Sequence, residues 1–230
     1  MRYLFTFSLL LLAASAFAQA KLNLPLKREL DSIYVQDQKY RELMVGISNG
    51  KTDSLAKVLG LPKDQLFWHT YTSMALTDST NLRRIEAIVK RYGYPGQSLV
   101  GTPTNEAVYN VIQHSDKIPQ YLPQVKAAAE THEIPYRLYA QMLDRKLVGE
   151  GKKQLYGTQG GSYTILNKAS GQRETTFYIW PIQNPIRVNK RRKHAGFPNT
   201  MEESAANLHI PYKPVTLEYV KELRQQSLVK

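Results

Sequence analysis

Apolar residues recur along much of the chain at the three- and four-residue spacing of an amphipathic helix. Between Pro25 and Ile47 one such stripe is formed by Leu26, Leu30, Ile33, Tyr40, Met44 and Ile47. The position that this stripe skips holds Asp37, and Arg41 follows one turn later, where it can pair with the carboxylate. We therefore predict a long helix that carries a paired acid on its apolar side.

Further helical stretches follow as far as Arg145. Residues 77–81 are Thr, Asp, Ser, Thr and Asn, which prefer helix caps to helix interiors, so we predict that one helix ends and another begins there. Thr102 followed by Pro103 predicts a cap with proline in the first turn, opening a helix that carries Gln113 and His114 near its end. The first two-thirds of the chain are thus expected to be helical.

The period changes after Gly151. Segments rich in Tyr, Thr, Ile and Phe, separated by glycine-containing turns, occupy residues 154–159, 162–166 and 175–180. They predict a small antiparallel hairpin or three-stranded meander near residues 154–182. Helix then returns: Asn184 can cap a segment that ends near Gly196, and Thr200 with Glu203 forms a capping-box pattern. A last helix is expected over residues 216–226, which makes the fold class mainly α.

The N-terminal residues read as a targeting segment. Arg2 precedes an apolar run from Leu4 to Leu12, and small residues follow at positions 16, 18 and 20. We expect residues 1–20 to be a signal peptide, cleaved after Ala18 or Ala20, because the run is shorter than the ~20 residues of a membrane span. The protein is then exported to the periplasm or beyond, has no later membrane segment, and forms one mainly helical domain over residues 21–230.

Composition narrows the class of protein. The 230 residues are 42% hydrophobic and 22% charged, which excludes wholesale disorder, and the absence of cysteine excludes disulfides. The formal charge is +12, and Gly151–Lys230 holds 13 of the basic residues against 5 acidic ones. The densest basic run is Lys190–His194. In an exported chain it suggests an anionic envelope polymer as partner rather than nucleic acid, or else only a solvated helix face.

Polar side chains gather where the helical part meets the predicted strands. Asp144 and Arg145 end one helix, and Gln154, Tyr156, Thr158 and Gln159 follow next to glycines. Neutral donors and acceptors beside flexible backbone suit sugars or peptide amides, so ligand binding is one interpretation. A turn whose polar groups satisfy one another is the other.

Several short segments resemble the landmarks of a family of bacterial proteins of unknown function. They run from about Leu30 to Gly196 and comprise Asp37–Arg41, Asp78 with Asn81, Gly93–Pro95, Val100–Gly101, Gln113–Asp116, Asp144–Arg145, Gln154–Gln159 and Asn189 with Arg191–Arg192. The resemblance implies a shared fold and a shared polar pocket. It implies no known activity, cofactor or catalytic residue.

Catalysis has three candidate residues: His114, Asp37 and Asp144. His114 lies at the end of a predicted helix, near Asp116, and both the helix dipole and a carboxylate would raise its pKa. Asp37 and Asp144 are the acids least like surface charges, and a glycosidase needs such a pair, although internal ion pairs with Arg41, Arg145 or another Arg explain them better. The histidines are scattered without a metal-ligand spacing, so we expect neither a metal nor another cofactor.

These observations lead to three functional hypotheses. The first is a pocket for a small polar or envelope-derived ligand, built from Asp37, Arg41, His114, Asp144, Arg145, Gln154, Tyr156, Thr158 and Gln159. The second is a hydrolase of glycan or amide bonds that uses His114 or an Asp as acid or base. The third is a scaffold that adheres to anionic polymer through its basic C-terminal face.

Overall fold

The computed structural model describes residues 21–167 and 170–228, so the predicted signal peptide lies outside the described residues. The helices are α1 (Leu24–Ser48), α2 (Thr52–Leu59), α3 (Lys63–Tyr92), α4 (Gln97–Val100), α5 (Ala107–Ile112), α6 (Ile118–Glu130), α7 (Tyr136–Gly149), α8 (Val188–His194), α9 (Met201–Asn207) and α10 (Leu217–Leu228). The two strands are β1 (Gly160–Leu166) and β2 (Arg173–Ile179). This confirms the mainly α class with a small hairpin.

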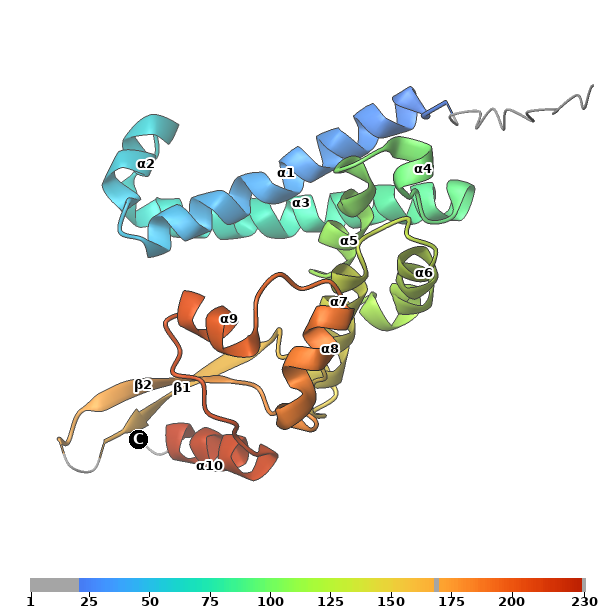
Figure 1. Cartoon of the computed structure of the whole chain (residues 1–230). Coiled ribbons are helices and arrows are strands. Elements are labelled where there is room, and N and C mark those ends of the chain that lie inside the picture. Colours follow the sequence, from blue (N-terminus) through green and yellow to red (C-terminus); the bar gives the residue numbers. More distant parts are fainter. Residues whose placement is uncertain (1–20, 168–169, 229–230) are drawn as a thin grey trace, which may run out of the picture.

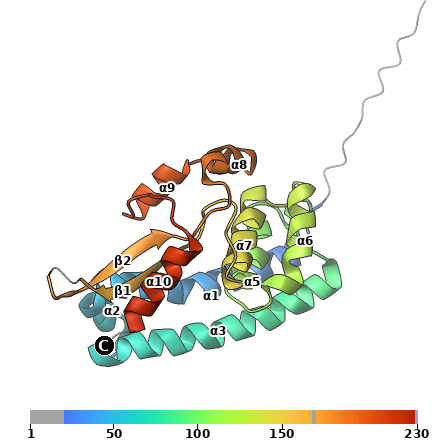
Figure 2. The same cartoon turned by 90° about the horizontal axis from the view of Figure 1, so that it is seen from below.

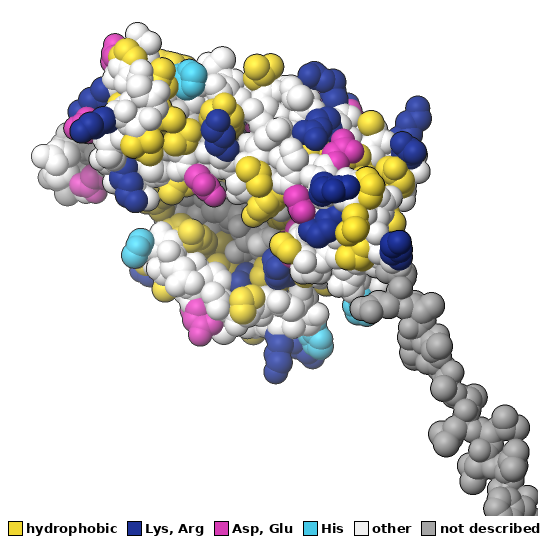
Figure 3. All heavy atoms as spheres, turned by 90° about the horizontal axis from the view of Figure 1, so that it is seen from above, with side chains coloured by type: hydrophobic (Ala, Val, Ile, Leu, Met, Phe, Trp, Pro, Cys, Tyr) yellow, Lys and Arg dark blue, Asp and Glu magenta, His cyan; other side chains and the backbone are white. Residues whose placement is uncertain are grey.

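The elements form two parts that meet on one side of the molecule (Figure 1). Helices α1 and α3 lie side by side along the upper side, while the hairpin and α10 lie on the lower side, and α5, α6 and α7 fill the connecting side. Figure 2 shows α8 and α9 on the opposite edge from α3. Seen from above, the surface is hollowed near its middle, with hydrophobic and charged side chains on the rim (Figure 3). No helix among residues 21–167 and 170–228 is long and apolar enough to cross a bilayer.

Helix α1 is the amphipathic helix that its apolar stripe predicts. The Asn23 side chain caps it by accepting a hydrogen bond from the backbone N–H of Leu26 at 3.1 Å. Leu30 and Ile33 are fully buried against α3 and α5. Burial of such side chains stabilises a fold by about 1.5–3 kcal/mol each, so the stripe positions α1 firmly on the main core.

Helix α3 is continuous, so the predicted break at residues 77–81 is wrong. Two polar residues of that segment are used in contacts with α1: Asn81 donates from its buried amide to the carbonyl of Ile33 at 3.3 Å, and Asp78 accepts a hydrogen bond from Arg41 at 2.9 Å. Weak local preferences of Ser, Thr, Asp and Asn for caps are overridden because tertiary partners and apolar packing on both sides sustain the helix.

The predicted cap at Thr102 is also replaced by a different geometry. A 3₁₀ turn, Thr104–Glu106, precedes α5, and no side-chain cap forms at either start. Helix α5 is nevertheless buried along most of its length, with Val108 and Ile112 almost inaccessible. It ends at Ile112, so Gln113 and His114 follow the helix instead of lying within it as predicted, and these side chains lie at the edge of the main core.

The β structure is the hairpin, and the three-stranded alternative is wrong. In the antiparallel register Gly161 lies opposite Tyr178 and Tyr163 lies opposite Thr176. Residues 155–159 form no strand, and Gln154 makes only an isolated bridge to Ile182. The backbone N–H groups of Leu155, Tyr156 and Thr158 donate to a side chain of α7, described below, and are therefore not available to a third strand.

The C-terminal helices complete two smaller apolar clusters. Helix α9 begins with the predicted capping box: Thr200 accepts from the N–H of Glu203 at 3.2 Å, and the Glu203 carboxylate accepts from the N–H of Thr200 at 2.7 Å. Asn184 does not cap α8, because it adopts a positive φ of 49° and a 3₁₀ turn, Pro185–Arg187, follows it. Helix α10 packs its Val220 and Leu223 against Tyr178 of the hairpin.

Candidate functional site

Asp144 of α7 holds the segment 154–159, which we call the polar loop. Its carboxylate is fully buried and accepts hydrogen bonds from the backbone N–H groups of Leu155, Tyr156 and Thr158 and from the Thr158 hydroxyl, at 2.7–3.1 Å. Burial raises the pKa of Asp144 even though these hydrogen bonds oppose the rise. With its lone pairs occupied by backbone donors, Asp144 organises the loop and is not free to act as an acid or base.

Two arginines of α8 bind the backbone carbonyl groups of the same loop. Arg191 donates to the carbonyl of Leu155 at 2.8 Å, and Arg192 donates to the carbonyl of Tyr156 at 2.8 Å and to that of Asn199 at 2.9 Å. Arg192 is buried, while Lys190, Lys193 and His194 are exposed. The densest basic run of the sequence is therefore in part a structural clamp rather than one continuous surface for a polymer.

The remaining polar-loop residues also satisfy one another. The buried amide of Gln154 donates to the carbonyls of Gln159 and Trp180 at 2.8 and 2.7 Å and accepts from the N–H of Gln159 at 2.9 Å. Gly157 has a φ of +72°, and a Cβ there would lie 2.2 Å from the sulfur of Met201. The loop is a packed structural element, as the second of the two interpretations expected.

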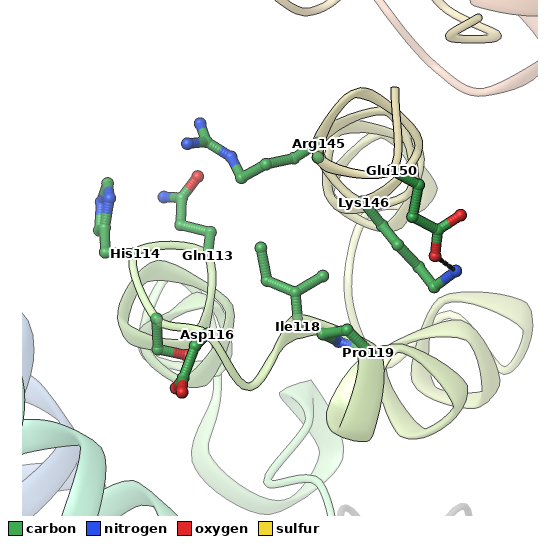
Figure 4. A pocket seen from close by; sticks show the side chains of 10 residues that line it. Gln113, His114, Asp116, Ile118, Pro119, Arg145, Lys146 and Glu150 are labelled. Atoms are coloured by element: carbon green, nitrogen blue, oxygen red, sulfur yellow. Dashed lines mark hydrogen bonds and ion pairs between the residues drawn. The ribbon is translucent and has the colours of Figure 1, made fainter. Parts of the chain in front are cut away.

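His114 and Arg145 lie apart from the polar loop and line a cavity of about 570 Å³ between the end of α5, the start of α6 and α7. Figure 4 shows Arg145 extending from α7 across the top of this cavity, with the Gln113 amide beneath it and His114 beyond. Lys146 and Glu150, on the far side, form an ion pair with each other. The cavity thus has one paired cation at one end and Arg145 at the other.

Arg145 is half-buried and has no hydrogen-bond or ion-pair partner among the described residues. Its positive charge acts on its neighbours all the same: burial raises the pKa of Tyr109 and Arg145 opposes that rise, while burial lowers the pKa of His114 and Arg145 adds to that lowering. A guanidinium carries five N–H donors in a planar fork that matches a carboxylate or a phosphate. Arg145 is therefore the cation of this region that is free to meet an anion.

The pKa of His114 is lowered to about 4, which corrects the expectation that it is raised. Surrounding protein contributes most, and the positive charges of Arg41 and Arg145 add to it. Asp116 does not offset them: it points away from His114 in Figure 4 and makes no ion pair with it. The ring remains exposed to solvent, so at neutral pH the cavity presents a neutral imidazole with one donor and one acceptor nitrogen.

Asp37 and Arg41 form the contact that their spacing predicts, on the side of α1 that faces α3. The guanidinium of Arg41 lies 3.5 Å from the Asp37 carboxylate and 2.9 Å from that of Asp78. Asp37 is only 1% exposed, and its Oδ1 has no hydrogen-bond partner within the part of the chain that the structure describes. Burial raises the pKa of Asp37 to about 6, against the opposing effect of Arg41.

The predicted site residues thus fall into two groups. One group forms the polar loop and its acceptor: Asp144, Gln154, Tyr156, Thr158 and Gln159. The other group consists of His114, Arg145, Arg41 and Asp37. Arg41 and Arg145 both lower the pKa of His114, and Arg41 also pairs with Asp37. The Lys146–Glu150 pair is not among the predicted contacts, although its four-residue spacing is typical of an ion pair on a helix.

The described residues form a mainly helical fold with a β-hairpin, in which Asp144 holds the polar loop and a cavity opens beside His114. No cluster of three or more His, Asp or Glu side chains suited to a metal ion occurs in the described ranges. The chain belongs to a family of unknown function, DUF6624, whose model matches residues 61–212. Searches of curated proteins and of solved structures found no match.

The matched region contains the polar loop and the His114 cavity, but not all of the predicted landmarks. It begins just before α3, so Asp37 and Arg41 of α1 lie outside it, as does α10 at the other end. Family membership therefore supports a common framework for the loop and the cavity and assigns no activity to either.

Proposed function

We propose that this protein is an exported binding protein that holds a small anionic ligand in the His114 cavity. The observation that carries the proposal is the Arg145 guanidinium, which lines the cavity without a partner among the described residues. Export rests on the pattern of residues 1–20, which lie outside the described residues. Amino-terminal sequencing of the protein recovered outside the cytoplasm tests it, and a retained residue 1 would contradict it.

The ligand class follows from the charges around the cavity. Arg41 and Arg145 both act on His114 as positive charges, so an anion gains Coulomb energy beside this ring. Arg145 can bind a carboxylate or phosphate with two parallel hydrogen bonds, and the neutral His114 can donate a third. A volume of about 570 Å³ suits a small molecule rather than a polymer segment.

The direct test is calorimetric and NMR titration of the mature protein with inorganic phosphate, succinate and a neutral sugar. We expect the anions to shift the His114 ring resonances saturably and the sugar to have no effect. Arg145→Gln should weaken anion binding at least tenfold, because it removes the charged fork.

Lys146→Gln is the matched control for Arg145→Gln. It removes the same charge from the next residue of α7, but Lys146 is already paired with Glu150, which Lys152 also contacts at 2.9 Å. Binding should change only slightly in this variant. Equal weakening in both variants would show that the cavity responds to net charge alone, and the proposal would fail.

A second candidate is a hydrolase in which His114 acts as the general base. What favours it is the neutral, exposed imidazole beside an unpaired guanidinium that could stabilise a developing oxyanion. Turnover of envelope glycan or peptide fragments that disappears in His114→Gln would support this role. Absence of turnover over a broad panel of such fragments would contradict the hydrolase role, and only the binding function would remain.

A further inference from the structure

A second cavity lies where α10 covers the hairpin. It encloses about 240 Å³ and is lined by Gly151, Tyr163, Trp180, Leu217, Lys221 and Arg224, among others. Val220 and Leu223 of α10 pack on Tyr178 and anchor the helix over β1. The site is separate from the His114 cavity, since the two share no lining residue.

The aromatic side chains of this cavity are held in place. The indole N–H of Trp180 donates to the carbonyl of Lys152 at 2.8 Å, which fixes the ring at the end of β2. Tyr163 stacks on Tyr178 with ring centroids 6.1 Å apart and an angle of 16° between the rings. Preorganised aromatic faces carry negative charge above the ring and attract the weakly positive C–H groups of a sugar.

The opposite wall of the cavity is basic. Lys221 and Arg224 lie three residues apart on α10 and therefore on one face of the helix, and both are exposed. Glu218 of the same helix has a lowered pKa, chiefly because its carboxylate accepts hydrogen bonds from its own backbone N–H and from Thr216, with smaller effects of the positive charges of Lys221 and Lys153. The Arg224 guanidinium has no hydrogen-bond or ion-pair partner among residues 21–167 and 170–228.

We propose that this cavity binds one carboxylated sugar residue of an acidic polysaccharide, with its ring against Trp180 and Tyr163 and its carboxylate on Arg224. The volume lies below the ~300–1,000 Å³ of sites for drug-sized ligands, so it admits a single ring. A fixed indole and an unpaired guanidinium on facing elements supply the two kinds of contact that an acidic sugar needs. The role is distinct from the function proposed above and places polymer recognition at α10 instead of at α8.

Tryptophan fluorescence tests this proposal because the chain has only two tryptophans. Trp68 is 65% exposed on α3, so Trp68→Phe costs little stability and leaves Trp180 as the sole reporter. In that background we expect trigalacturonic acid to change the emission of Trp180 saturably. Galactotriose, which lacks the carboxylates, should bind at least tenfold more weakly.

Two charge variants complete the experiment. Arg224→Gln should weaken binding of the acidic trisaccharide at least tenfold, whereas Lys193→Gln removes the same charge from an exposed position of α8 and should have no effect. Arg145→Gln should also leave it unchanged, which separates this site from the His114 cavity. An unchanged Trp180 signal, equal binding of both trisaccharides, or equal losses in Arg224→Gln and Lys193→Gln would each overturn the proposal.

Discussion

The polar loop and the His114 cavity contain the same kinds of side chain but use them differently. In the loop, the Asp144 carboxylate and the Gln154 amide each meet several partners. At the cavity, Arg145 and the His114 ring have no hydrogen-bond partners within the described ranges. A satisfied buried network adds rigidity, whereas unpaired groups beside an opening are available to a ligand. Pairing, and not residue type, distinguishes structure from candidate function here.

The two buried aspartates extend the comparison. Asp144 is surrounded by donors, while Asp37 has one oxygen without a hydrogen bond and shares Arg41 with Asp78. Asp144 therefore supports the fold. Asp37 keeps a charge at a position where burial disfavours it, as residues retained for function often do.

Among these variants, we expect Asp144→Ala to lose the most stability against unfolding. Truncation leaves the backbone donors of the polar loop and the nearby Arg192 without their carboxylate, and breaking such a buried charged network costs about 3–5 kcal/mol. For a chain of this size each kcal/mol lowers the midpoint of thermal unfolding by roughly 2–4 °C. Circular dichroism melting measures it, and an unchanged midpoint would refute the structural role of Asp144.

Next comes Gly157→Ala, with Gly151→Ala as its matched control. Both glycines have a φ near +70°, but an added Cβ meets the Met201 sulfur at Gly157 and open space at Gly151. Each variant bears the backbone cost of about 1–2 kcal/mol, and Gly157→Ala adds about 1–3 kcal/mol of overpacking. Chemical denaturation should therefore show a larger loss of unfolding free energy in Gly157→Ala than in Gly151→Ala. Equal losses would mean that the polar loop is not tightly packed.

Asp37→Asn is expected to raise stability at neutral pH. Because the folded pKa of Asp37 is raised to about 6, its ionised form destabilises the fold above that pH, on the order of 1–3 kcal/mol, and the penalty fades as pH falls toward 4. Arg41 keeps Asp78 as a partner in the variant. Melting at pH 8 and pH 4 should show a gain only at pH 8. A loss at pH 8 would indicate that the Arg41 pair outweighs burial.

The smallest expected effect is a change in the pKa of His114. Its folded pKa near 4 means that the neutral ring stabilises the fold fully above pH 6.5 and that this contribution is lost as pH falls through about 4. Arg145→Gln removes a positive neighbour and should move the pKa upward, as followed by NMR of the His114 ring. A downward or absent shift would place Arg145 too far away to share a ligand with His114.

Local patterns predicted a large part of the fold. The spacing of Leu26, Leu30 and Ile33 predicted α1, and the Thr200–Glu203 box predicted the start of α9. The same reasoning failed at residues 77–81 and at residues 155–159. In both segments, residues far away in the sequence stabilise the backbone conformation. Ile33 and Arg41 do so for α3, and Asp144 does so for the polar loop.

The candidate site was predicted less completely than the fold. The sequence singled out His114 and Arg145 but joined them to the polar loop, because both segments are polar and close to glycines. It also predicted the wrong direction for the pKa of His114, because burial of the ring lowers this pKa most and Arg41, from a helix more than seventy residues earlier, lowers it further. No sequence pattern around Arg224 predicted the cavity between α10 and the hairpin.

The sequence by itself determined the helical class, the hairpin, the basic C-terminal third and the identity of the polar residues. Periodicity and capping act over a few residues, so they can be read without knowing the rest of the fold. Only the tertiary structure decided which polar groups are paired, as Asp144 is, and which are left free, as Arg145 is. Hydrogen bonds and Coulomb forces depend on distances of a few ångströms between segments far apart in the chain, and folding alone sets those distances.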